Sequence, residues 1–207
     1  AFDACGPRFV LGVLETRDRR VWMGCQDQLM RFDPATGQMQ RWAATDAVHP
    51  APRGRVGLFA EAGDGTLWVA SHSTIQQRAV NGRVIATIER GDGRGLGASD
   101  MIEQLLLGPD GGVWAATSAG LVYWDDGARR FAPVPGAATE PTYGVALGDD
   151  GMVWAAGFGQ LHAYAWDGAQ LRAVRTVDGA AGLPAVAPGG VVVDGGGVVW
   201  VTTVRGI

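Results

Sequence analysis

Lysine is missing from this sequence of 207 residues, so all 17 of its basic side chains are arginine. This absence excludes chemistry that needs a lysine, such as Schiff-base formation or the phosphate-binding lysine of P-loop proteins. The arginines are scattered and the formal net charge is −4, so no basic stripe typical of nucleic-acid binding is present. We therefore expect no contact with nucleic acid.

Long apolar runs are also missing, because glycine or proline interrupts each one before the ~18 residues that a membrane helix needs. The sequence starts at Ala1 without a charged segment followed by an apolar one, so we expect any signal peptide or anchor to lie outside these residues. No segment shows a convincing helical period. These observations predict a soluble all-β segment without membrane contact of its own.

Histidine is scarce, with three copies, and none has a second histidine or a cysteine at metal-ligand spacing. No Gly-x-Ser-x-Gly or similar nucleophile motif occurs. The favoured interpretation of each histidine is an ordinary loop or strand residue, so no catalytic residue, metal or cofactor is expected. The three are His49, His72 and His162.

The two cysteines, Cys5 and Cys25, do not settle the redox compartment. If 9–15 and 21–25 form a hairpin, Cys25 lies opposite Gly12. Cys5 would then be roughly 20 Å away at ~3.3 Å per residue, unless Gly6-Pro7 folds the chain back. Whether the two cysteines pair is left open.

Glycine, in contrast, is abundant, with 33 copies, more than twice the roughly 7% of average proteins. Many of these glycines belong to a repeat marked by tryptophan, in which the spacings are 46, 46, 40 and 46 residues. Each tryptophan is preceded by a turn-like segment and followed by a small residue two positions later and an aliphatic one seven positions later. A fixed period of this length predicts a repeat architecture. The tryptophans are Trp22, Trp68, Trp114, Trp154 and Trp200.

Each repeat resolves into four short strands separated by Gly-rich or Asp-Gly turns. Four strands in about 45 residues describe one blade of a β-propeller. The sequence therefore predicts an all-β propeller of four-stranded antiparallel blades. Four blades are complete, at about 8–42, 55–88, 101–134 and 143–174, and part of a fifth lies at 188–207.

The tryptophans are interpreted as structural anchors of the blades. Side chains alternate along a strand, so each ring shares a face with the small residue two positions later. A large ring beside a small neighbour suits interlocking blades, and burial of each ring removes about 150–250 Å² from water. The aspartates of the preceding turns are predicted to bond the local backbone rather than to catalyse. They are Asp18, Asp64, Asp110, Asp150 and Asp194.

The fifth repeat stops where its third strand should begin. An open blade leaves unpaired strand edges, which favour aggregation. We therefore expect the chain to be part of a larger propeller of about seven blades. Closure of five blades by a partner chain is the alternative.

The pattern resembles the two-component regulator propeller repeat, whose consensus is roughly Asp-x-x-Gly-x-hydrophobic-Trp-x-Gly-Thr-x-x-Gly-Leu. The resemblance spans nearly the whole chain, but the second and fourth blades carry Thr74 and Gln160 in place of the glycine before the aliphatic residue. The third blade matches best, through Asp110, Gly111, Val113, Trp114, Thr117, Gly120 and Leu121.

This resemblance implies a periplasmic, ligand-sensing module of a bacterial transmembrane signalling protein. The output would come from a histidine kinase or diguanylate cyclase elsewhere in the same full-length protein, and the ligand would be a small polar molecule such as an oligosaccharide. A homodimer is left open. The alternatives are a propeller enzyme similar to streptogramin lyases, which would use His49 or His72, and a protein-interaction scaffold.

The predicted ligand-binding face carries the blade-to-blade connections at 43–54, 89–100, 135–142 and 175–188, together with the loops between second and third strands. These segments are long and varied, whereas the turns of the opposite face are short and repetitive. Function concentrates in variable loops on rigid scaffolds. An aromatic ring, an arginine and amides near one rim would suit a polar ligand. The candidates are Gln26, Asp27, His49, His72, Phe158 and Arg205.

Overall fold

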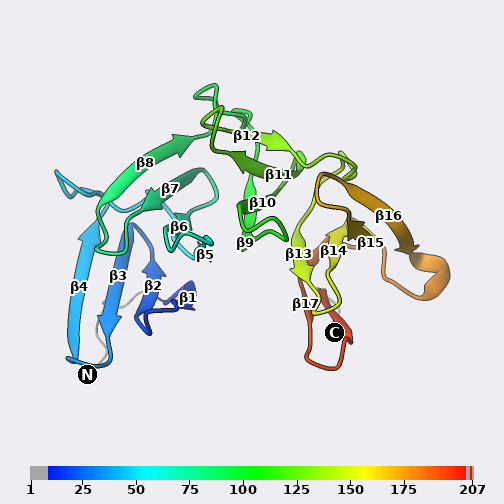
Figure 1. Cartoon of the computed structure of the whole chain (residues 1–207), viewed down its shortest axis with the longest axis horizontal. Helices are drawn as coiled ribbons and strands as arrows, with labels where there is room; N and C mark the ends of the chain where they lie inside the picture. The colour runs from blue at the N-terminus through cyan, green and yellow to red at the C-terminus, as the bar shows by residue number, and fades with distance from the viewer. Residues whose placement is uncertain (1–8, 204–205, 207) are drawn as a thin grey trace. The chain divides into compact units, whose positions relative to one another are not determined.

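The structure, a computed structural model, describes residues 9–203 and 206. It divides into two compact units, residues 1–105 and 106–207, which we describe separately. Apart from one short 3-10 helix, Gly179–Ala181, the described elements are strands, drawn as arrows in Figure 1. No helix in the described part of the chain has the length and apolarity needed to traverse a bilayer.

The first unit contains two four-stranded antiparallel sheets in which strands adjacent in sequence are paired. This is the strand order that the repeat predicts for a propeller blade. The first sheet consists of β1 (Gly12–Glu15), β2 (Val21–Cys25), β3 (Gln28–Asp33) and β4 (Gln38–Ala43). The second consists of β5 (Leu58–Glu61), β6 (Leu67–Ala70), β7 (Thr74–Arg78) and β8 (Val84–Glu89).

The remaining sheets follow the same order. In the third sheet, β9 (Ile102–Leu107) crosses the boundary between the units and is followed by β10 (Val113–Thr117), β11 (Gly120–Asp125) and β12 (Arg130–Pro133). The fourth sheet consists of β13 (Gly144–Leu147), β14 (Met152–Gly157), β15 (Gln160–Trp166) and β16 (Leu171–Val177). A two-stranded sheet is formed by β17 (Pro188–Val193) and β18 (Val199–Thr203).

The turns before the tryptophan strands share one geometry. An aspartate side chain accepts a backbone N–H two residues later, for example Asp64 from Thr66 at 2.8 Å and Asp110 from Gly112 at 3.0 Å. In the first four turns the residue after the aspartate has a positive φ, as at Gly65 (φ 85°), whereas in the fifth turn the positive φ falls at Gly197. The recurring aspartates are therefore occupied by turn formation.

The tryptophans differ in how they are covered. Trp22, Trp68 and Trp114 are at most 2% exposed. Trp22 packs in a core cluster with Leu67 and Val69 of the second sheet. Trp200 is 48% exposed, so the expectation of a buried ring does not hold there. Its strand β18 pairs with β17 alone among the described strands.

The small residue two positions after the tryptophan is needed for a close backbone approach. At Gly24, a Cβ atom would lie 2.3 Å from the carbonyl oxygen of Val56. The backbone of Gly24 in β2 therefore lies against the backbone of Val56, just before β5, and Val56 packs with Trp22 in the same core cluster.

The N-terminal hairpin differs by one residue from the expected register, because Gly24 rather than Cys25 lies opposite Gly12. Cys25 is fully buried and disulfide-bonded. The chain's other cysteine, Cys5, lies outside the described residues.

Candidate functional site in the first unit

Gln26 and Asp27 occupy the turn between β2 and β3 and hold the connection 43–54 in place. The backbone N–H of Asp27 donates to the carbonyl of Gly54 at 2.8 Å, and its carboxylate accepts the Gly54 N–H at 2.6 Å. Gln26 Nε2 donates to the second carboxylate oxygen of Asp27 at 3.1 Å. Both predicted ligand-binding residues are thus engaged in fixing a loop.

His72 has a similar structural role at the connection that follows the second sheet. Its Nδ1 lies 2.9 Å from the carbonyl oxygen of Ile102, and its own carbonyl accepts the Ile102 N–H at 3.2 Å. Because a carbonyl can only accept, Nδ1 carries the proton and Nε2 is the remaining acceptor. The ring therefore joins the loop after β6 to the start of β9.

Phe158, His162 and Arg205 do not belong to the first unit. Phe158, 62% exposed, belongs to the second unit, where it lies in the turn between β14 and β15. His162 Nδ1 lies 3.1 Å from Thr176 Oγ1 on the neighbouring strand. Arg205 lies outside the described residues. No group of three or more potential metal ligands occurs in the part of the chain that the structure describes.

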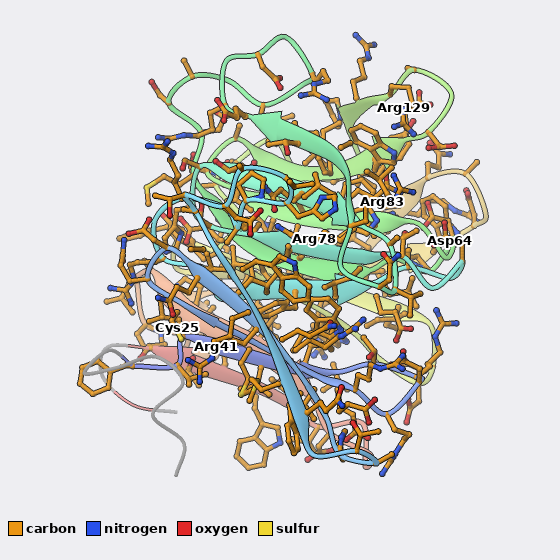
Figure 2. All side chains as sticks on the ribbon, turned by 90° about the vertical axis from the view of Figure 1, so that its left-hand side faces the viewer. Cys25, Arg41, Asp64, Arg78, Arg83 and Arg129 are labelled. Carbon is orange, nitrogen blue, oxygen red and sulfur yellow. The ribbon has the colours of Figure 1, made fainter. Side chains whose placement is uncertain are left out.

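Arg78 on β7 is a central residue that the sequence analysis missed. Its side chain is fully buried, and no described carboxylate forms an ion pair with it. It donates instead to Gln76 Oε1 at 2.7 Å, to the carbonyl of Gly82 at 2.8 Å and to the carbonyl of Pro50. Figure 2 labels Arg78 among the strands of the second sheet.

The surroundings of Arg78 explain its charge state. Burial lowers the pKa of its guanidinium to about 10, and the nearby Asp46 carboxylate partly offsets that effect. The group is therefore still a cation at neutral pH. Its central carbon lies 5.7 Å from the ring centroid of Trp42, so the two side chains form a cation–π contact. The sequence did contain a signal of this buried polar residue. Gln76-Gln77-Arg78 makes the third strand of the second repeat more polar than the third strands of the other repeats.

His49 lies on the connection 43–54, where its carbonyl oxygen is 3.5 Å from an Arg78 guanidinium nitrogen. Its backbone N–H donates to Asp46 at 2.8 Å, and its ring Nδ1 is buried without a partner among the described residues. The hydrogen bonds from the His49 and Val48 N–H groups lower the pKa of Asp46. Asp46 therefore carries a full negative charge at neutral pH.

A cavity of about 380 Å³, which we call the connection cavity, lies between the connection 43–54 and the β7–β8 ribbon. One wall is a single face of that ribbon: Thr74 pairs with Glu89, and Gln76 with Thr87, and alternate residues of a strand share a face. The opposite wall comes from the connection. The lining residues are Ala44, Thr45, Asp46, Pro50, Ala51, Pro52, Arg53, Thr74, Gln76, Thr87 and Glu89.

Several polar groups in the connection cavity have no partner. The side chains of Thr74, Thr87, Arg53 and Glu89 make no hydrogen bond or ion pair with any described residue. Thr74 is only 8% exposed, yet its hydroxyl remains open to the cavity. Groups of this kind can bind a polar molecule without first breaking a bond within the protein.

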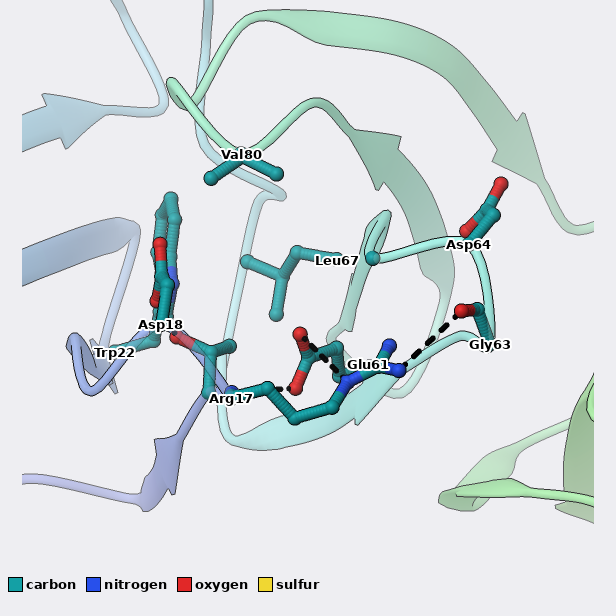
Figure 3. A pocket seen from close by; sticks show the side chains of 10 residues that line it. Arg17, Asp18, Trp22, Glu61, Gly63, Asp64, Leu67 and Val80 are labelled. Atoms are coloured by element: carbon teal, nitrogen blue, oxygen red, sulfur yellow. Dashed lines mark hydrogen bonds and ion pairs between the residues drawn. The ribbon is translucent and has the colours of Figure 1, made fainter.

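A second cavity of about 330 Å³, the turn cavity, lies on the short-turn side of the same two sheets (Figure 3). Here the polar groups are already paired. Arg17 Nε lies 3.2 Å from Glu61 Oε1, and the backbone N–H of Arg17 donates to Glu61 Oε2 at 2.8 Å. The Asp18 carboxylate accepts hydrogen bonds from the side chains of Thr16 and Arg20. A polar ligand would have to compete with this network, so the connection cavity is the better candidate site.

No protein-family model and no curated protein matches this chain. Solved structures do, at low identity. Over 96% of the chain, with a TM-score of 0.77 and 16% identity, it is similar to a protein named as the extracellular domain of a hybrid two-component system from B. thetaiotaomicron. Over 93%, with a TM-score of 0.66 and 13% identity, it is similar to virginiamycin B lyase from Staphylococcus aureus. Over 94%, with a TM-score of 0.66 and 10% identity, it is similar to the Dos1 propeller.

At such identities these similarities establish the fold: the chain has the all-β fold of a propeller, as the tryptophan repeat predicts. The chain spans 27%, 62% and 53% of the three proteins, respectively. The structures that share this fold include an extracellular domain of a two-component system and a lyase, and a shared fold does not fix function.

Proposed function

We propose that this chain is a non-catalytic, ligand-sensing propeller module that binds a small polar molecule in the connection cavity. The observation that carries this proposal is the set of unpartnered groups of Thr74, Thr87, Arg53 and Glu89 around one cavity. Similarity to an extracellular domain of a two-component system supports it at the level of the fold. Such a module would be periplasmic and would belong to a bacterial signalling protein.

The cavity is suited to sensing because its two walls belong to different parts of the first unit. The connection 43–54 leaves the first sheet, and the β7–β8 ribbon belongs to the second. A ligand that bonds both walls stabilises one arrangement of the connection over others. An output domain of the same full-length protein, or the contacts of a homodimer, would report that change.

A binding screen with a matched variant tests this proposal. Thr74→Val keeps the side-chain shape but removes the hydroxyl, and Thr139→Val makes the same change at an exposed threonine of the second unit. Compounds, including oligosaccharides, are screened by thermal shift and followed by calorimetry. We expect a hit whose affinity falls about fivefold in Thr74→Val and is unchanged in Thr139→Val. Absence of any hit, or equal binding by both variants, contradicts the proposal.

The second candidate is a lyase, which the similarity to virginiamycin B lyase favours. The bond between His72 Nδ1 and the Ile102 carbonyl leaves Nε2 as a base on the same side of the sheets. Turnover of virginiamycin B, lost in His72→Ala with folding intact, would support this candidate over the sensor. Binding of a partner protein but no small molecule would favour a scaffold.

A further inference from the structure

Arg53 and Glu89 carry opposite charges, line the same cavity and do not pair. Several other charged side chains of the same unit are already paired, as Arg17 is with Glu61 at 3.2 Å and Arg94 with Asp92 at 2.7 Å. Arg53 belongs to the connection that forms one wall, and Glu89 belongs to β8 on the other wall. A ligand between them meets a cation on one side and an anion on the other.

Glu89 remains unpaired although two arginines follow it closely in the sequence. Arg94 pairs with Asp92, and Arg90 donates to the carbonyl oxygen of Asp100 at 3.0 Å. Neither guanidinium is therefore engaged with the Glu89 carboxylate. The carboxylate stays available to a cation that enters the cavity.

We propose that the ligand is a zwitterion, a free amino acid or short peptide, whose carboxylate binds Arg53 and whose ammonium binds Glu89. This inference rests on the proposed function of the connection cavity. Arginine matches a carboxylate through two parallel N–H donors. An ammonium group fits Glu89, with the carboxylate of Asp46 on the same cavity wall as Arg53 adding attraction. The hydroxyls of Thr74 and Thr87 supply further hydrogen bonds.

Other ligand classes suit the cavity less well. None of the described residues lining it is aromatic, so a sugar would find no ring on which to stack and would leave both charges unmatched. A simple anion would face Asp46 and Glu89, and a simple cation would leave Arg53 unmatched. Because two carboxylates oppose one arginine, basic amino acids should bind more tightly than acidic ones.

Calorimetry with a panel of blocked ligands tests the inference. The panel contains glycine, lysine, glutamate and diglycine, N-acetylglycine without the ammonium, glycinamide without the carboxylate, and maltose as a neutral sugar. We expect lysine and diglycine to bind, glutamate to bind less well, and each blocked form to bind at least about tenfold more weakly than its parent. Maltose should show no binding.

Variants then assign the two charges. Arg53→Ala should abolish discrimination between glycine and glycinamide, and Glu89→Gln should abolish discrimination between glycine and N-acetylglycine. Arg55→Ala and Glu103→Gln serve as matched controls, because neither residue lines the cavity. Denaturation midpoints establish that all four variants fold.

The outcomes separate this inference from the proposed function. Binding of maltose or another neutral compound, lost in Thr74→Val but retained in Arg53→Ala and Glu89→Gln, overturns the zwitterion and leaves the sensor standing. Binding of no compound by the folded protein overturns both. Zwitterion binding that persists unchanged in Arg53→Ala and Glu89→Gln also overturns the assignment of this cavity.

Discussion

The guanidinium of Arg78 lies over the indole ring of Trp42, with its central carbon 5.7 Å from the ring centroid. Arg78 belongs to the second sheet and Trp42 to the first, and the same guanidinium donates to the Pro50 carbonyl in the connection between them. One buried cation therefore fastens both sheets and the wall of the connection cavity.

Replacement of Arg78 by methionine should destabilise the protein. The change leaves the Gly82 carbonyl and the Gln76 amide oxygen without their donor and removes one of the two donors to the Pro50 carbonyl, at a cost of about 2–4 kcal/mol in the free energy of unfolding. Urea denaturation measures the effect. Arg83→Met, at an exposed arginine five residues away, should change the free energy by less than about 0.5 kcal/mol. Equal effects of the two changes would refute this role for Arg78.

Replacement of Arg19 by glycine should stabilise the protein. It has a φ of 65° at the turn position where the other repeats place Gly65, Gly111, Gly151 and Gly197. Arg19→Gly removes backbone strain and should stabilise the protein by about 0.5–1 kcal/mol. The exposed ion pair with Glu15 contributes little.

The reverse change is the matched control for Arg19. Gly65→Ala, at φ 85°, should destabilise the protein by a similar amount. Denaturation curves of both variants give the comparison. An unchanged or lower stability of Arg19→Gly would show that the turn is not strained.

Asp46 should make the free energy of unfolding depend on pH. Its folded-state pKa lies below the ordinary value of 3.8, because the His49 and Val48 N–H groups donate to it. A lowered carboxyl pKa gives stability that is present above 3.8 and lost as the pH falls through the folded-state pKa. The difference in stability between the protein and Asp46→Asn should therefore be largest at pH 7 and should decrease below pH ~4. A difference that stays constant across that range in acid-titrated thermal melts would contradict this reasoning.

Gly24 should not tolerate a methyl group. A Cβ at this position would lie 2.3 Å from the Val56 carbonyl oxygen, so Gly24→Ala should destabilise the protein by about 1–3 kcal/mol. Gly195→Ala is the control, because a Cβ there meets nothing within 4 Å and φ is not positive. A Gly24→Ala variant as stable as Gly195→Ala would mean that Gly24 and Val56 do not approach as closely as described.

The fold could be predicted because its signals are local and repeated. A tryptophan, a small residue such as Gly24 two positions later and an Asp-Gly turn each specify strand pairing within one repeat, and their recurrence predicted the four-stranded sheets. Trp200 departs from this pattern because local sequence does not say which strand will cover a ring.

The site was less predictable, because its residues meet through tertiary structure. The connection 43–54 was expected to be functional, and it does line the cavity. However, the partners of Asp27 and His72 are the backbones of Gly54 and Ile102, which no sequence pattern indicates. Nothing in the sequence distinguishes Arg53 and Glu89 from other charged residues. Only the structure shows that both line one cavity without forming an ion pair with each other.

The central claim, that a small polar ligand binds in the connection cavity, is tested most directly by amide chemical-shift mapping on the ¹⁵N-labelled protein. The tightest ligand of the binding panel is added to saturation. Perturbed amides should cluster at 44–53, 74–76 and 87–89. Perturbations confined to the turn cavity around Arg17 and Glu61, or to the loop of Phe158, would contradict the account.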